Sequence, residues 1–417
     1  MAQHLAVGSL ALVGFNPSAP LPPLARSLDP KPPTQVIDGV EHPGCPTIAA
    51  GLQHFASGYM RNWGRDTFIS LRGLLLTTGR YTDARYIILG FAGCLRHGLI
   101  PNLLDRGMNA RFNCRDAVWW WLQCIKDYCQ MVPDNRGFSI LSDPVQRLYP
   151  TDDSQAKITE PVEQPLHQVM QEAFLRHFRG IDFKERNWGV KIDEQMTEEG
   201  FNVRVGVDRS TGFVYGGNKH NCGTWMDKMG SSSKAGNRGV PSSPRDGSAV
   251  ELVGLSFSVI SWINTLKEQN IWPYEGVTYE KEFWSWKDWS DKIAANFENQ
   301  FFISLNTDYY LINRREIYKD TVGASEEWQD YQLRPNFVIA LALAPELFDP
   351  DHARRALETV RDVLLGPLGM KTLDPSDWNY RGDYHNDNDS TDMKVAHGFN
   401  YHQGPVSLIE IRRSSLL

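Results

Sequence analysis

The spacing of apolar residues most restricts how this chain can fold. Residues 67–80 place apolar side chains at every third or fourth position, which predicts an amphipathic helix. A second helix is predicted over 81–95, after a break at Gly79. The same spacing predicts further helices at 118–129, 166–178, 250–266, 286–297, 337–344 and 353–365.

Long loops rich in Gly, Asp, Asn and Trp separate these helices, at 149–161, 212–246 and 371–405. Strand signals are sparse, and the best predict a hairpin of 201–207 with 213–215. The alternative all-α fold is a solenoid, but the chain has no fixed-length repeat. We therefore expect a toroid of helix hairpins whose loops build a site at one end.

The N-terminal part has a different character. Residues 16–50 contain many prolines and little periodicity, so we expect 1–50 to be an irregular lead-in and 51–417 to form the helical domain. Residues 5–15 are apolar like the core of a signal peptide, but the positive flank that usually precedes such a core is missing.

Charge and cysteine content exclude several classes of function. The chain has 43 basic and 50 acidic residues, a net charge of −7, and no block of lysine or arginine, which argues against nucleic-acid binding. No apolar stretch approaches the roughly 18 residues of a membrane-spanning helix. The six cysteines form no CxxC pair and are expected to be buried thiols in a reducing compartment.

Aromatic residues are abundant, with 13 tryptophans. Indole faces stack on sugar rings, although packing is their commoner role. In the first polar cluster Trp63 can floor a sugar, while Arg65 and Asp66 offer hydrogen bonds to neighbouring hydroxyl groups. The alternative is a helix-capping aspartate beside a packed indole.

The second cluster joins Asp116 to three consecutive tryptophans, 119–121. Successive helical residues point about 100° apart, so we expect at least one indole to leave the core. Trp121 belongs to the apolar stripe, which leaves Trp119 or Trp120 for a pocket. Asp116 has the alternative role of a helix cap.

The third cluster is the most suggestive. Asp227 lies between Trp225 and Lys228, an indole that can bind a sugar and an ammonium group that can tune the pKa of a carboxyl. Arg245 and Glu251 follow. A glycosidase needs two carboxyl groups, and spacing alone does not say which pair faces each other. For each acid the alternative is a solvated loop residue.

The fourth cluster includes His402 and Gln403 and follows a run of aspartates. That run suggests a calcium loop, but it lacks the turn glycine and closing glutamate of an EF-hand, so no metal is expected. Motifs of zinc proteases, phosphate-binding loops and serine hydrolases are missing from the sequence, and no feature calls for a cofactor.

Together these motifs resemble the C-terminal amylo-α-1,6-glucosidase domain of eukaryotic glycogen debranching enzymes, a family of glucoamylase-like glycoside hydrolases. The resemblance runs in unbroken order over about 1–405. It rests on residues 63–68, 95–103, 113–121, 149–154, 221–229, 244–251, 331–337 and 366–374.

The resemblance implies an (α/α)6 toroid and hydrolysis, with inversion, of the single α-1,6-linked glucose left at a branch point of glycogen or limit dextrin. The resemblance also implies that this hydrolysis takes place in the cytosol and needs no cofactor. Asp227 corresponds to the general acid of the family. The substrate-binding residues implied are Trp63, Arg65, Asp66, Asp116, Trp120, Trp225, Lys228, Arg245, Glu251, His402 and Gln403.

The sequence also departs from the family pattern. After His-Gln-Gly-Pro the family continues with Glu-Trp, and that glutamate is its general base, whereas this chain has Val406 and Ser407. Glu410 is the nearest later carboxyl. Family members continue for several helices, so we expect an incomplete toroid. The alternatives are a catalytically impaired glucan-binding chain and, with less support from the motif order, a trehalase-like enzyme.

Overall fold

The computed structural model describes residues 2–51, 55–56, 58–107 and 109–407. The protein is mostly helical, with small sheets of two or three strands in the described residues. The chain divides into two compact units, Met1–Arg176 (unit 1) and His177–Leu417 (unit 2), which are described separately.

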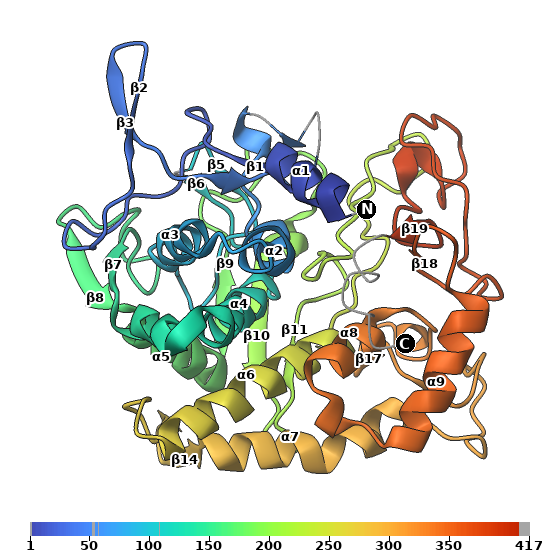
Figure 1. Cartoon of the computed structure of the whole chain (residues 1–417). Helices are drawn as coiled ribbons and strands as arrows, with labels where there is room; N and C mark the ends of the chain where they lie inside the picture. Colours follow the sequence, from blue (N-terminus) through green and yellow to red (C-terminus); the bar gives the residue numbers. More distant parts are fainter. Residues whose placement is uncertain (1, 52–54, 57, 108, 408–417) are drawn as a thin grey trace. The chain divides into compact units, whose positions relative to one another are not determined.

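Helices form most of the core of unit 1 (Figure 1). They are α1 (Ala2–Leu12), α2 (Gly64–Leu71) with a π-helical turn (Arg72–Leu76), α3 (Tyr81–Ala92), α4 (Ala117–Met131) and α5 (Leu166–Arg179), whose last residues belong to unit 2. Four antiparallel pairs accompany them: β1 (Val13–Gly14) with β4 (Thr47–Ile48), β2 (Thr34–Ile37) with β3 (Val40–Pro43), β5 (Leu104–Asp105) with β6 (Asn109–Ala110), and β7 (Pro144–Arg147) with β8 (Val162–Pro165).

Helix α4 is buried on nearly every side. All three of its consecutive tryptophans are at most 1% exposed, so the expectation that one would leave the core is wrong. The reason is that α4 has neighbours all round: the Trp121 indole donates a hydrogen bond to the carbonyl of Ile88 in α3 (3.2 Å), while Trp119 packs on Phe174 of α5. A helix enclosed in this way can bury indoles pointing in three directions.

Unit 2 contains α6 (Val250–Glu268), α7 (Trp286–Phe301), α8 (Asn336–Leu343) and α9 (Pro350–Val363). Its three-stranded antiparallel sheet has the order β11 (Val214–Gly216), β10 (Asn202–Val207), β9 (Ile181–Lys184). The two-stranded pairs are β12 (Ser248–Ala249) with β17 (Thr321–Val322), β13 (Gly276–Tyr279) with β14 (Glu282–Ser285), β15 (Phe302–Ile303) with β16 (Ile317–Tyr318), and β18 (Met370–Lys371) with β19 (Val406–Ser407).

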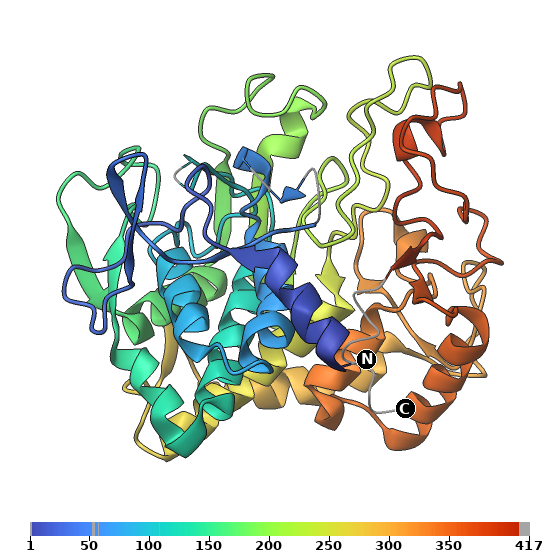
Figure 2. The same ribbon diagram turned by 45° about the horizontal axis from the view of Figure 1, so that its top comes forward.

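Two long loops of unit 2, 217–247 and 372–405, lie side by side (Figures 1 and 2). The Asn237 amide donates hydrogen bonds to the carbonyls of Met393 (3.0 Å) and Ala396 (3.1 Å). The Ser231 hydroxyl lies 3.0 Å from Nδ1 of His397. Polar side chains therefore join these loops, which have few apolar residues to bury.

The predicted helices are all present, and the predicted hairpin is the β10–β11 pair. The lead-in is less irregular than expected, since it contains α1 and the hairpin of β2 and β3. That hairpin turns at Asp38 and Gly39, both with positive φ, a turn signal that the proline content obscured. None of the described helices is both long and apolar enough to cross a membrane.

Candidate active site

Asp227, the predicted general acid, follows a run of buried residues in unit 2, 221–226. Asp227 itself is half-buried, whereas Trp225 is 4% exposed and Met226 is fully buried. The Trp225 indole donates a hydrogen bond to Oδ1 of Asn336 (2.9 Å), and the Met226 sulfur accepts weak contacts from Nδ2 of Asn336 (3.8 Å) and Nη1 of Arg334 (3.6 Å). These contacts fix the backbone immediately before the acid.

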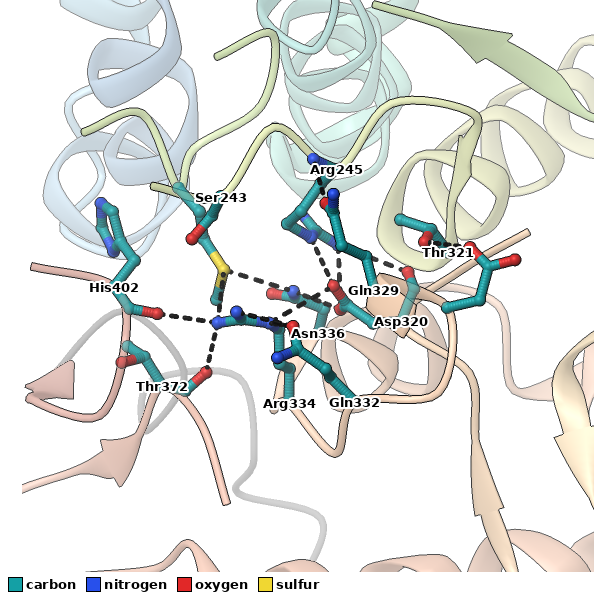
Figure 3. A network of polar contacts seen from close by, with 12 residues as sticks. Ser243, Arg245, Asp320, Thr321, Gln329, Gln332, Arg334, Asn336, Thr372 and His402 are labelled. Carbon is teal, nitrogen blue, oxygen red and sulfur yellow. Dashed lines mark hydrogen bonds and ion pairs between the residues drawn. The ribbon is translucent and has the colours of Figure 1, made fainter. Parts of the chain in front are cut away.

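Arg245 anchors the same segment through a buried ion-pair network (Figure 3). Its guanidinium donates to both oxygens of Glu251 (2.6 and 2.7 Å), to both oxygens of Asp320 (2.6 and 3.1 Å) and to the Thr224 hydroxyl (3.0 Å). Arg245, Glu251 and Asp320 are each almost fully buried. Burial by itself lowers the pKa of Arg245, but the charges of Asp320 and Glu251 outweigh it and raise that pKa above its ordinary value.

Arg334 is the second buried guanidinium of this network (Figure 3). It donates to Oε1 of Gln332 (2.8 Å), to the carbonyls of Thr372 (3.0 Å) and His402 (2.7 Å), and to Oε1 of Gln403 (2.8 Å). Burial lowers the pKa of Arg334 to about 10. Because it also contacts Met226, Arg334 joins the segment that carries Asp227 to the His402–Gln403 segment.

Both residues of the His402–Gln403 segment are buried. The Gln403 amide donates to the Ser243 hydroxyl (3.0 Å), so it holds the loop that precedes Arg245. The His402 ring packs edge-on against Trp225, with ring centroids 5.3 Å apart. Five of the predicted site residues in unit 2 thus belong to one contact network: Trp225, Arg245, Glu251, His402 and Gln403.

Val406 is the first residue of β19, where it pairs with Lys371 of β18. Its side chain is 49% exposed and carries no proton acceptor. Glu410, the later carboxyl noted in the sequence, lies outside the described residues.

Lys228 is half-buried, and its ammonium group donates to Oδ1 of Asn386 (3.3 Å). Burial lowers the pKa of Lys228, and the charge of Asp227 acts in the opposite direction.

In unit 1 the predicted residues surround the start of α2. Trp63 and Asp66 are half-buried, and the Trp63 indole donates to the carbonyl of Met60 (2.7 Å). Gly64 is required here, because a Cβ at this position would lie 2.2 Å from the carbonyl oxygen of Pro101. Through this close approach the motif at 63–66 packs directly against the motif at 95–103.

Arg65 and Asp116 form a buried ion pair with Nε–oxygen distances of 2.7 and 2.9 Å. Asp116 stands at the N-cap position of α4, but its side chain makes no capping hydrogen bond and is used for Arg65 instead. The pair ties the starts of α2 and α4 together. Trp120, four residues after Asp116 in the sequence, is also buried, with 1% of its surface exposed.

Three network residues were missed as candidates by sequence reasoning: Asp320, Arg334 and Asn336. Asn336 donates to Oδ1 of Asp320 (2.7 Å), and Arg334 lies 3.7 Å from the same carboxylate. Arg334 and Asn336 stand in the motif 331–337, which could have indicated them. Asp320 stands in no such motif, and only the fold brings it to the site.

One residue of the aspartate run considered for calcium, Asp389, is engaged in an ion pair. Asp389 accepts from the Lys234 ammonium (3.1 Å), and this hydrogen bond lowers the pKa of Asp389. Within the described parts of the chain, no cluster of three His, Cys, Asp or Glu side chains could hold a metal ion.

A sequence model of the family described as amylo-alpha-1,6-glucosidase matches residues 32–411. The chain belongs to this family. It is also 47% identical, over 374 residues, to glycogen debranching enzyme from Saccharomyces cerevisiae. The aligned part is 86% of this chain and 24% of the yeast protein, so the chain spans about a quarter of that relative. The amylo-alpha-1,6-glucosidase match covers every candidate residue in both units.

Proposed function

We propose that the chain acts on α-glucans such as glycogen or limit dextrin, as an amylo-α-1,6-glucosidase that removes the single glucose left at a branch point with inversion. We further propose an (α/α)6 toroid and a cytosolic location. The observation that carries the proposal is the family match together with the network around Arg334, which holds the Asp227 and His402–Gln403 segments to one guanidinium.

In this proposal Asp227 gives its proton to the glycosidic oxygen as the bond to glucose breaks. Productive proton transfer requires the carboxyl within hydrogen-bond reach of that oxygen. The contacts of Trp225 and Met226 with Asn336 and Arg334 supply the needed rigidity, because they hold the backbone before Asp227.

The predicted binding residues then fall into three groups. Arg245, Glu251, Arg65 and Asp116 use their charges on partners inside their own units, so we assign them to positioning the loops that they join. The residues with accessible surface that can meet a sugar are Trp63, Asp66 and Lys228. Trp120, Trp225, His402 and Gln403 support these residues from within the two cores.

Val406 favours a second candidate function, glucan binding with impaired turnover. An inverting glycosidase needs a carboxylate to activate water, and a positioned base contributes about 10²- to 10⁴-fold to the rate. Valine cannot act in this way. In this alternative the chain retains the sugar contacts but releases no measurable glucose.

One assay separates the two candidates. The purified protein is incubated with phosphorylase limit dextrin trimmed to single glucose stubs, and free glucose is measured. We expect slow release that is lost in Asp227→Asn, because the amide has no acidic proton to give. Retention on a glycogen column without release would favour the binding function. Activity on trehalose and not on dextrin would overturn both.

A further inference from the structure

A pocket of about 470 Å³ lies in unit 2 on the loops beside the polar network. Its lining includes the indoles of Trp328 and Trp378, which meet edge to face with centroids 5.3 Å apart, and the buried ring of Phe399. Trp378 is 61% exposed, so much of its indole is accessible to a ligand. The volume falls within the range of about 300–1,000 Å³ that is typical of ligand sites.

Polar groups of both signs surround these rings. Lys219, Lys394 and Glu326 line the pocket together with the amide of Asn379. The Lys394 ammonium lies 4.2 Å from the centre of the Trp378 ring. Flat apolar faces beside mixed donors and acceptors suit a neutral ring that has C–H faces and a rim of hydroxyl groups. The two lysines supply donors and the glutamate an acceptor at different positions of the lining, as the hydroxyl groups of a sugar require.

The pocket is also joined to the segment that carries Asp227. Its wall includes Pro241 and Ser242. Pro241 is the bridge partner of Met229, and the Ser242 amide donates to the carbonyl of Lys228 (2.9 Å). Paired backbones lie about 5 Å apart, so the pocket wall runs directly beside the acid segment.

A further lining residue is connected to the network. Gln329, also in the lining, accepts a hydrogen bond from the Arg245 amide (2.9 Å). Three lining residues, Pro241, Ser242 and Gln329, are therefore held by contacts with the acid segment or with Arg245.

We propose that this pocket binds a linear stretch of α-1,4-glucan, with the Trp378 indole as its main stacking surface. The pocket thereby holds the chain that carries a branch, while a stub approaches Asp227. The choice of an α-glucan rests on the proposed function, whereas the stacking site itself rests on the pocket. Asp227 is not among the residues lining it.

The test is calorimetric titration of the full chain with maltoheptaose, which has no α-1,6 branch. We expect binding by the unmodified protein and an increase in Kd of about tenfold or more in Trp378→Ala, the usual effect of truncating a central aromatic anchor. Asn379→Ala is a second pocket variant and weakens binding in the same direction. Thermal unfolding midpoints equal to that of the unmodified protein show that the variants are folded.

Trp188→Ala is the matched control. Trp188 is 47% exposed and also has a lysine over its ring, with the Lys184 ammonium 3.4 Å from the ring centre, but it lies outside the pocket lining. Its loss should leave the affinity unchanged. Equal losses in Trp188→Ala and Trp378→Ala, unchanged affinity in Trp378→Ala, or no binding by the unmodified protein would each overturn the assignment.

The outcome is separable from that of the proposed function. Asp227→Asn should abolish glucose release and leave maltoheptaose affinity unchanged. Binding that depends on Trp378 without any glucose release supports the pocket and contradicts the glucosidase. Glucose release by the unmodified protein together with unchanged maltoheptaose affinity in Trp378→Ala supports the glucosidase and contradicts the pocket assignment.

Discussion

Arg334 contacts three separate segments of unit 2 through one guanidinium. It reaches the sulfur of Met226, the carbonyl of Thr372, and both His402 and Gln403. A planar fork of N–H donors can satisfy several acceptors at once, which a lysine ammonium cannot reproduce. We therefore regard Arg334 as the positioning residue of the proposed site.

Replacing Arg334 with lysine keeps the charge but loses the fork. We expect kcat for glucose release to fall by up to about 10²-fold with a nearly constant KM, because small displacements of an acid slow the chemical step more than binding. The substitution is made in a Val406→Glu variant, which supplies the carboxylate that Val406 lacks. Glucose release from trimmed limit dextrin is then measured well below the unfolding temperature.

Arg204→Lys is the control for that substitution. Arg204 pairs with Asp182 at the surface, where both side chains are mostly exposed, so this change should alter neither kcat nor stability measurably. If Arg334→Lys behaves like Arg204→Lys, the positioning role is wrong.

The sequence indicated some residues of the candidate site but not the partners with which they interact. It found Arg65 and Asp116, but not that they pair with each other across two helices. It found Arg245 and Glu251, yet not Asp320, the carboxylate that Arg245 also holds. Local motifs show which side chains carry polar groups, whereas a partner far along the chain is chosen by the fold.

At the scale of elements, the packing of α6 on α8 depends on a glycine. A Cβ at Gly254 would lie 2.7 Å from both Cα and Cβ of Ala340, closer than real carbon atoms approach. Helix α6 is buried along most of its length, so a clash there has little room to relax. Helix α8 in turn begins at Asn336, whose side-chain oxygen accepts the hydrogen bond of the Trp225 indole.

Gly254→Ala should therefore destabilise the protein by about 1–3 kcal/mol, the usual cost of overpacking a core. Gly8→Ala in α1 is the opposite case, since nothing lies within 4 Å of the added Cβ, and it should be neutral or stabilising by roughly 0.5–1 kcal/mol. Urea unfolding of both variants measures the difference. A Gly254→Ala protein as stable as the unmodified one would contradict the close packing.

The helices could be predicted because their apolar spacing is regular, but their ends could not. The helix expected at 67–80 begins at Gly64, pinned by the hydrogen bond of its amide to the carbonyl of Asn102 (2.7 Å), and becomes a π-helical turn at Arg72–Leu76. Neither feature follows from periodicity. Both are set by contacts with segments elsewhere in the chain.

At the scale of the whole molecule, the family match runs through both units. Sequence order alone indicated the family, since the motifs follow one another from 63–68 to 366–374. In unit 2, what sequence could not show is that a compact set of hydrogen bonds around Arg245 and Arg334 joins the last motifs to the acid segment.

The central claim is that the Asp227 and Val406 segments belong to one glucosidase site that lacks only its base. The most direct measurement is the rate of glucose release from trimmed limit dextrin by Val406→Glu, Asp227→Asn and the double variant. The account predicts that Val406→Glu raises the rate by about 10²-fold or more and that adding Asp227→Asn removes the gain. Equal rates for Val406→Glu and the unmodified protein, or a gain that survives Asp227→Asn, would contradict it.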